Sequence, residues 1–140
     1  MKYRYLPHTA DAKIEAFGKD LNELFKNAAL ATYNIMVETQ KVEPLKEIEI
    51  KLNSESIESL LYDWIEELLF YLDTEKFLIN NTEVKIKKSG ENNISLKATL
   101  KGDRISKKYE LGGSVKSMTY NCLIIEKTKD GFRTIFVVDR

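Results

Sequence analysis

Two stretches of helical periodicity, followed by a long series of strand-like runs, constrain the fold of this chain most. Apolar side chains recur every three to four residues in 21–37 and again in 56–76, which predicts two amphipathic helices. The runs that read as strands cover residues 3–6, 12–18, 47–53, 83–88, 93–102, 106–111, 114–127 and 132–139. The order predicts an α+β fold with two layers, a mostly antiparallel sheet and two helices packed on one face.

Capping and turn residues punctuate these elements. Asp20 precedes the first helix as a good N-cap, and Asn53 or Ser54 can cap the second helix. Glycine with asparagine or aspartate separates the later strands, as at Gly102 and Asp103. The sharpest of these signals, Asp130-Gly131, predicts a hairpin with a type I′ turn.

The composition is that of one ordinary globular domain spanning residues 1–140. The chain is 43% hydrophobic and 31% charged, with no net charge, which argues against non-specific coating of nucleic acid. Cys122 is the single cysteine, lies in an apolar run and is expected to be a small buried residue. No disulfide, signal peptide or membrane span is expected, so we predict a cytoplasmic protein.

Two charged surfaces have alternative interpretations. Residues 54–75 contain seven carboxylates and no Lys or Arg, which makes either a solvated helix face or an acidic surface for a partner. The lysine-rich strands between Lys85 and Lys108 are most simply the solvent side of an antiparallel sheet. Their rival interpretation is a weak basic groove for RNA or a phosphorylated ligand.

Common catalytic signatures are absent from the sequence. It contains no Walker A loop, no GxGxxG, no HExxH, no CxxC pair and no GxSxG. With one histidine and one cysteine, a structural zinc site would lack its usual ligands. A metal ion here would therefore be a hard cation held by oxygen atoms.

Two places could supply such oxygen atoms. The segment from His8 to Asp11 lies between two short strands, and Asp11 is either a turn cap or part of a site. The final apolar strand ends at Asp139, and we expect its carboxylate to lie near the main-chain carbonyl of Val138 or Arg140 and near the terminal carboxylate. If Asp11 lies at the same edge of the sheet, these groups would form a hard-cation site.

Four collinear stretches carry a resemblance to a known family. They are HTADAKIEAFGKDLNELFKNAALATYNIMV from His8, LLYDWIEELLFYLDTE from Leu60, GGSVKSMTYN from Gly112 and VVDR from Val137. In this order they span essentially the whole chain, which resembles the archeases, in particular those of archaea.

The resemblance implies a small α+β protein that is not an enzyme. It implies a protein cofactor of the tRNA-splicing RNA ligase of the RtcB type, which joins 3′-phosphate and 5′-hydroxyl RNA ends in tRNA splicing or RNA repair. Such a cofactor promotes guanylylation and multiple turnover of the ligase and widens its nucleotide use, with RNA reached through the ligase.

The resemblance also implies a metal site, with calcium expected and magnesium or manganese as alternatives. Its ligands transfer onto Asp11, Asp139 and the main-chain oxygens of Arg140. His8 beside this site is an accessory residue, and Lys116 is an expected polar functional residue near the same edge.

The chain departs from the family pattern at two positions. Asn121 and Tyr109 stand where the family often has histidine, so a role for those histidines does not transfer. Two other functions also fit the residues alone. One is a metal-dependent phosphoester hydrolase, and the other is an RNA-binding or chaperone-like module that uses the lysine-rich strands and the aromatics Tyr3, Tyr5, Tyr109 and Tyr120.

Overall fold

The computed structural model describes residues 1–7 and 11–140. Its elements, in chain order, are β1 (Tyr3–Leu6), β2 (Ala12–Gly18), α1 (Leu21–Tyr33), a 3-10 turn (Thr39–Lys41), β3 (Lys46–Ser54), α2 (Ile57–Glu75), β4 (Phe77–Lys88), β5 (Ile94–Arg104), β6 (Ser117–Met118), β7 (Ile124–Thr128) and β8 (Gly131–Asp139). The two predicted helices and most of the predicted strands are therefore present.

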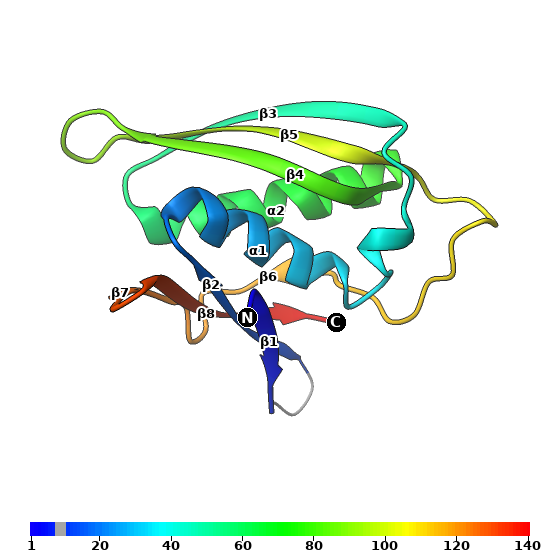
Figure 1. Cartoon of the computed structure of the whole chain (residues 1–140), viewed down its shortest axis with the longest axis horizontal. Helices are drawn as coiled ribbons and strands as arrows, with labels where there is room; N and C mark the ends of the chain where they lie inside the picture. Colours follow the sequence, from blue (N-terminus) through cyan, green and yellow to red (C-terminus); the bar gives the residue numbers. More distant parts are fainter. Residues whose placement is uncertain (8–10) are drawn as a thin grey trace.

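The helices lie in a layer between two antiparallel sheets (Figure 1). One sheet has three strands in the order β3-β5-β4, and the other has five, in the order β1-β2-β8-β6 with β7 also paired to β8. The α+β class is thus confirmed, whereas the strands divide between two sheets instead of forming one. Nine of the thirteen residues of α1 are buried, so this helix needs cover on both sides.

Local sequence signals explain how both helices begin. The Asp20 carboxylate accepts a hydrogen bond of 2.8 Å from the Glu23 N–H, which confirms this residue as the N-cap of α1. The cap of α2 is Ser56, whose hydroxyl accepts from the Ser59 N–H, two residues after the expected Ser54. The first helix ends at Tyr33 because the Asn34 side chain bonds the Leu30 carbonyl and turns the chain.

Two buried aromatic side chains join the layers. The Tyr33 hydroxyl lies between the Leu68 carbonyl of α2 and the Phe77 carbonyl of β4, at 3.2 and 3.0 Å. The Trp64 indole of α2 donates to the Phe25 carbonyl of α1 at 3.0 Å. The Tyr33 hydroxyl and the Trp64 indole N–H thus form hydrogen bonds inside the core, which hold the two helices in one relative position.

The structure departs from the predicted strands after β5. Residues 106–111 form no strand, because Tyr109 is buried with its hydroxyl 2.6 Å from the Asp103 carboxylate instead of pairing with a neighbour. The predicted strand 114–127 is divided into β6 and β7 by a turn in which Cys122 has a φ of 61°. Cys122 is exposed in that turn, so the expectation of a buried cysteine was wrong.

Two turn predictions also changed. Gly102 and Asp103 continue β5 to Arg104 instead of forming a turn. The β7–β8 hairpin is present, but Thr128 pairs with Gly131, and the loop residues Lys129 and Asp130 lack the positive φ of a type I′ turn. The predicted solvent side of the lysine-rich sheet is confirmed, since Lys85 and Lys97 face each other there and are exposed.

A buried carboxylate lies on β2 between two arginines. Glu15 is 1% exposed and accepts hydrogen bonds from the guanidinium groups of Arg4 on β1 and Arg133 on β8. Burial alone would raise the pKa of this carboxyl, but the two charged hydrogen bonds outweigh it and hold the pKa below its usual range. The ion pairs thus join three adjacent strands.

We expect Glu15→Gln to destabilise the protein by about 2 kcal/mol near neutral pH, less than for a fully buried pair because both arginines reach solvent. The native pKa of Glu15 is depressed, so its stabilisation is complete above the ordinary pKa of 4.5 and is lost as the pH falls through the native value. Urea unfolding at successive pH values should show the gap between wild type and variant closing below 4.5. Glu126→Gln, on an exposed partner of Arg133, is the control and should change little. A gap that is constant with pH would contradict this account.

Candidate functional site

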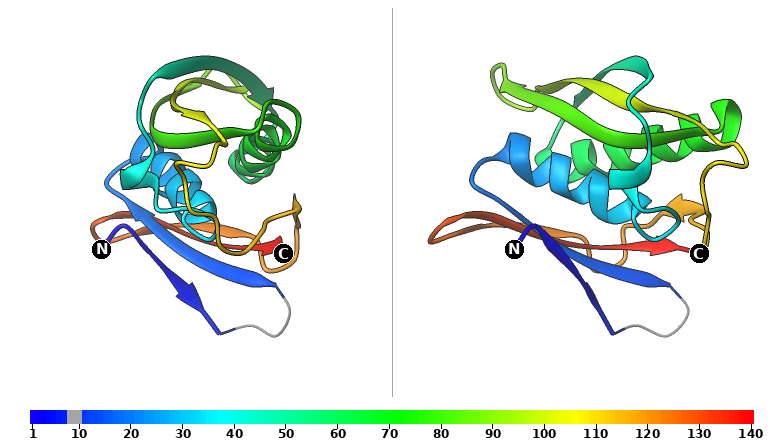
Figure 2. Two further views of the ribbon diagram at one scale, coloured as in Figure 1. Left: turned by 90° about the vertical axis from the view of Figure 1, so that its right-hand side faces the viewer. Right: turned by 45° about the vertical axis from the view of Figure 1, so that its right-hand side comes forward.

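The first residue of β2 and the end of β8 lie side by side in the five-stranded sheet. Ala12 pairs with Val138 in an antiparallel register, Asp11 directly precedes Ala12, and Asp139 directly follows Val138. Residues paired in this way have Cα atoms roughly 4.5–5.5 Å apart. Two aspartates far apart in the sequence therefore flank one strand pair at the same end of the sheet, where β2 and β8 lie next to each other (Figure 2).

The short strand β6 holds Asp139 from its other side. Ser117 pairs with Asp139, and its hydroxyl donates to the Asp139 Oδ2 at 3.0 Å. The Lys116 N–H donates to the Asp139 main-chain carbonyl at 2.8 Å. Ser117 was missed by the sequence analysis, because nothing in its neighbourhood indicates which strand it pairs with.

The structure thus places four of the five residues expected at this site at the same end of the sheet. Asp11, Asp139 and Lys116 lie at one edge, with Asp11 and Asp139 half-buried and Lys116 exposed. Arg140 follows Asp139 directly and is exposed. His8 lies outside the described residues.

The donor atoms at this edge match the preference of a hard cation. Asp11 and Asp139 supply carboxylate oxygens, and the main chain at Arg140 supplies further oxygen atoms. Within residues 1–7 and 11–140, no three His, Cys, Asp or Glu side chains gather closely enough to hold a metal ion. A cation here would need main-chain oxygens and water besides the two carboxylates, and calcium binding stays a prediction.

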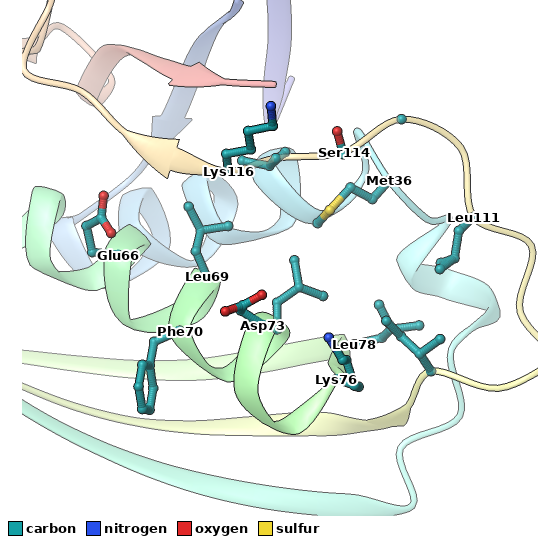
Figure 3. Close-up of a pocket in the computed structure, with 14 residues that line it drawn as sticks. Met36, Glu66, Leu69, Phe70, Asp73, Lys76, Leu78, Leu111, Ser114 and Lys116 are labelled. Atoms are coloured by element: carbon teal, nitrogen blue, oxygen red, sulfur yellow. The ribbon is translucent and has the colours of Figure 1, made fainter.

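A groove of about 580 Å³ begins beside this edge, between α2 and the irregular segment 105–116 (Figure 3). Met36, Leu69, Leu78 and Leu111 line it, while the Lys116 side chain extends toward the end of β8. On the side of α2, the Glu66 carboxylate accepts a hydrogen bond of 2.8 Å from the Met118 N–H of β6. Strand β6 therefore connects the groove wall at Glu66 to the aspartate edge.

Comparison with known proteins identifies the family. The model of the Archease protein family (MTH1598/TM1083) matches residues 3–139. The chain belongs to the archease family. It is 38% identical to Protein archease of Methanosarcina mazei over 99% of this chain and 95% of that protein. It is 40% identical to Protein archease of Sulfurisphaera tokodaii over 99% and 98% of the two chains.

A solved structure shows the same archease fold. The solution structure of Protein 1598 of Methanobacterium thermoautotrophicum superposes with a TM-score of 0.83 and 33% sequence identity, covering 99% of this chain and 98% of that chain. The archease family is one of protein cofactors, which implies a partner in RNA processing. In the described part of the chain, no helix is long and apolar enough to cross a bilayer.

The two departures from the archease pattern have different environments. Tyr109 is buried, donates to Asp103 and accepts the Glu43 N–H at 3.1 Å, so it anchors the groove segment to the turn before β3. Asn121 is exposed in the β6–β7 turn, where its N–H donates to the Thr119 hydroxyl. In this archease, Tyr109 therefore has a structural role.

Proposed function

We propose that this archease activates the tRNA-splicing RNA ligase of the RtcB type. It acts in the cytoplasm as a protein cofactor, promotes guanylylation and multiple turnover of the ligase, and widens its nucleotide use. The observation that supports the proposal most is the archease match over residues 3–139, together with two aspartates at adjoining strand ends.

We further propose that Asp11, Asp139 and the main-chain oxygens of Arg140 hold a hard cation, calcium first and magnesium or manganese as alternatives. A bound cation would supply positive charge for phosphate oxygens of the ligase's nucleotide or RNA end. Two neighbouring residues hold the oxygen atoms of Asp139 in position. Ser117 fixes the rotamer of the Asp139 carboxylate, and the Lys116 N–H fixes its main-chain carbonyl.

The Lys116 ammonium group has a separate role in this proposal. Its main chain is tied to Asp139, while its side chain is exposed and extends toward the end of β8. A lysine in this position can contact a phosphate on the partner without moving the carboxylates. It would thereby orient a nucleotide at the docked surface.

The test is a guanylylation and multiple-turnover ligation assay with Asp11→Asn and Asp139→Asn. We expect each variant to lose stimulation on the order of 10-fold to 100-fold, the loss typical when metal ligation is disturbed. Calorimetric titration of the archease alone with calcium should show weakened binding by the same variants. Asp130→Asn, in the exposed β7–β8 loop, is the matched control.

The outcomes separate the parts of the proposal. Full stimulation by both variants would remove the metal site and leave ligase activation standing. Wild-type protein that fails to stimulate its ligase would overturn ligase activation itself. Turnover of phosphoester substrates by the archease alone with calcium, magnesium or manganese would favour the hydrolase alternative.

A further inference from the structure

The groove beside the aspartate edge has an apolar floor that the fold leaves open. Met36, Leu69, Leu78 and Val115 are each less than a tenth exposed and come from the turn after α1, from α2, from β4 and from the segment before β6. The groove encloses about 580 Å³, which is enough for one or two apolar side chains of a partner.

Large apolar side chains continue from the groove onto the outer surface of α2. Phe70 is 55% exposed, and Leu111 is 44% exposed on the opposite wall. On the far side of Phe70 is a second hollow of about 420 Å³. Its lining consists of Leu52, Tyr62, Asp63, Glu66, Glu67 and Phe70. Phe70 thus forms a ridge between two hollows, and a partner surface of complementary shape can pack against it.

Carboxylates surround this ridge on α2. Asp63, Glu66, Glu67 and Asp73 lie within two turns of Phe70, and residues 54–75 contain no Lys or Arg to offset them. Partial burial raises the pKa of Asp63. Lys76 and Lys116 lie at the groove's ends (Figure 3). The outward surface of α2 therefore combines an apolar ridge with negative charge.

This surface is physically continuous with the aspartate edge. Glu66 on α2 bonds Met118 of β6, and Ser117 of the same strand bonds Asp139. A partner that reaches Asp139 therefore extends over β6 onto α2. We name the groove together with Asp63, Glu67, Phe70, Asp73 and Leu111 the α2 docking surface.

We propose that the α2 docking surface binds a cationic segment of the RNA ligase, with an apolar side chain in the groove and Arg or Lys side chains against the carboxylates. This inference rests on the proposed function and names the docking surface for it. An RNA ligase must line its active-site cleft with Lys and Arg to hold phosphates. An activator that presents Asp11 and Asp139 to that cleft meets a positive surface, to which α2 is complementary.

The carboxylates of α2 and the Phe70 side chain should affect different rate constants of ligase binding. Carboxylates at the rim steer association and make it sensitive to salt. An aromatic anchor in a desolvated centre mainly slows dissociation. The two kinds of variant should therefore have distinct kinetic effects, which a merely structural defect would not produce.

The experiment measures binding of the purified ligase to the full archease chain by biolayer interferometry over a range of salt concentrations. The triple variant Asp63→Asn, Glu67→Gln, Asp73→Asn should lower the association rate by at least about tenfold and flatten its salt dependence. Phe70→Ala should raise Kd about tenfold, mostly through faster dissociation. The matched control is Glu47→Gln, Glu49→Gln, Glu83→Gln, three exposed carboxylates on the outer face of the three-stranded sheet. Circular dichroism and thermal melts verify that each variant is folded.

The possible results distinguish the α2 docking surface, the metal site and ligase activation from one another. Unchanged binding by the folded triple variant and by Phe70→Ala, or equal loss in the control, overturns the α2 docking surface. Asp139→Asn should fail to activate the ligase even at archease concentrations that saturate binding. Activation retained by Asp139→Asn, with binding lost in the α2 variants, leaves docking standing and rejects the metal site. A wild-type chain that binds no ligase overturns the proposed function and docking together.

Discussion

Replacing Gly102 with alanine should destabilise the protein by about 3 kcal/mol or more, a large part of a typical domain's stability. A Cβ atom at this position would lie 1.8 Å from the Leu78 carbonyl oxygen and 2.9 Å from the Ile79 Cα, both backbone atoms. Gly102 pairs with Ile79 at the point where the register of β4 and β5 shifts. The buried residues Leu78 and Ile79 must therefore move if a methyl group is added.

The measurement is urea unfolding of Gly102→Ala against wild type. Gly112→Ala is a control of the same chemical change, because a Cβ there meets no atom within 4 Å. We expect the Gly112 variant to remain within about 0.5 kcal/mol of wild type. Equal stability of Gly102→Ala and Gly112→Ala would show that β4 and β5 separate without cost.

Truncating Trp64 should have an effect of similar size. The indole is fully buried between the helices, and Trp64→Ala should cost about 3–5 kcal/mol through lost burial and the cavity that remains. Trp64→Phe keeps much of the ring volume but loses the hydrogen bond to the Phe25 carbonyl, so its cost should be about 1–3 kcal/mol. Thermal and urea unfolding should give that order.

The control for this series is Leu45→Ala, at a side chain that is 62% exposed. It should change stability by less than about 0.5 kcal/mol. If Trp64→Ala were no more destabilising than Leu45→Ala, α1 and α2 would not depend on this contact for their packing.

Much of the local structure could be predicted from short-range patterns. The Asp20 cap, the alternation that produces β2 and the apolar stripe of α2 each depend on neighbours within a few residues. Where the predictions failed, a distant contact decided the conformation. Residues 106–111 alternate like a strand, yet Tyr109 finds its partners in Asp103 and in the Glu43 N–H instead of in a neighbouring strand.

At Gly102 and Cys122, too, distant contacts decided a conformation that the neighbouring sequence did not predict. Glycine beside aspartate usually marks a turn, but Gly102 is required inside β5 because the backbone of β4 approaches it closely. Cys122 lies in an apolar run, but the turn between β6 and β7 places it in solvent. Both outcomes depend on which strands pair, which alternation does not encode.

For function, the order of motifs in the sequence determined the family, and the archease match over residues 3–139 agrees. It also identified Asp11 and Asp139 as chemically suitable oxygen donors, without a way to bring them together. The tertiary structure decided that step through the antiparallel pairing of Ala12 with Val138. It also revealed Ser117 beside Asp139 and the groove along α2. The physical reason is that caps and periodicity are local, whereas strand register is fixed by core packing across the whole chain.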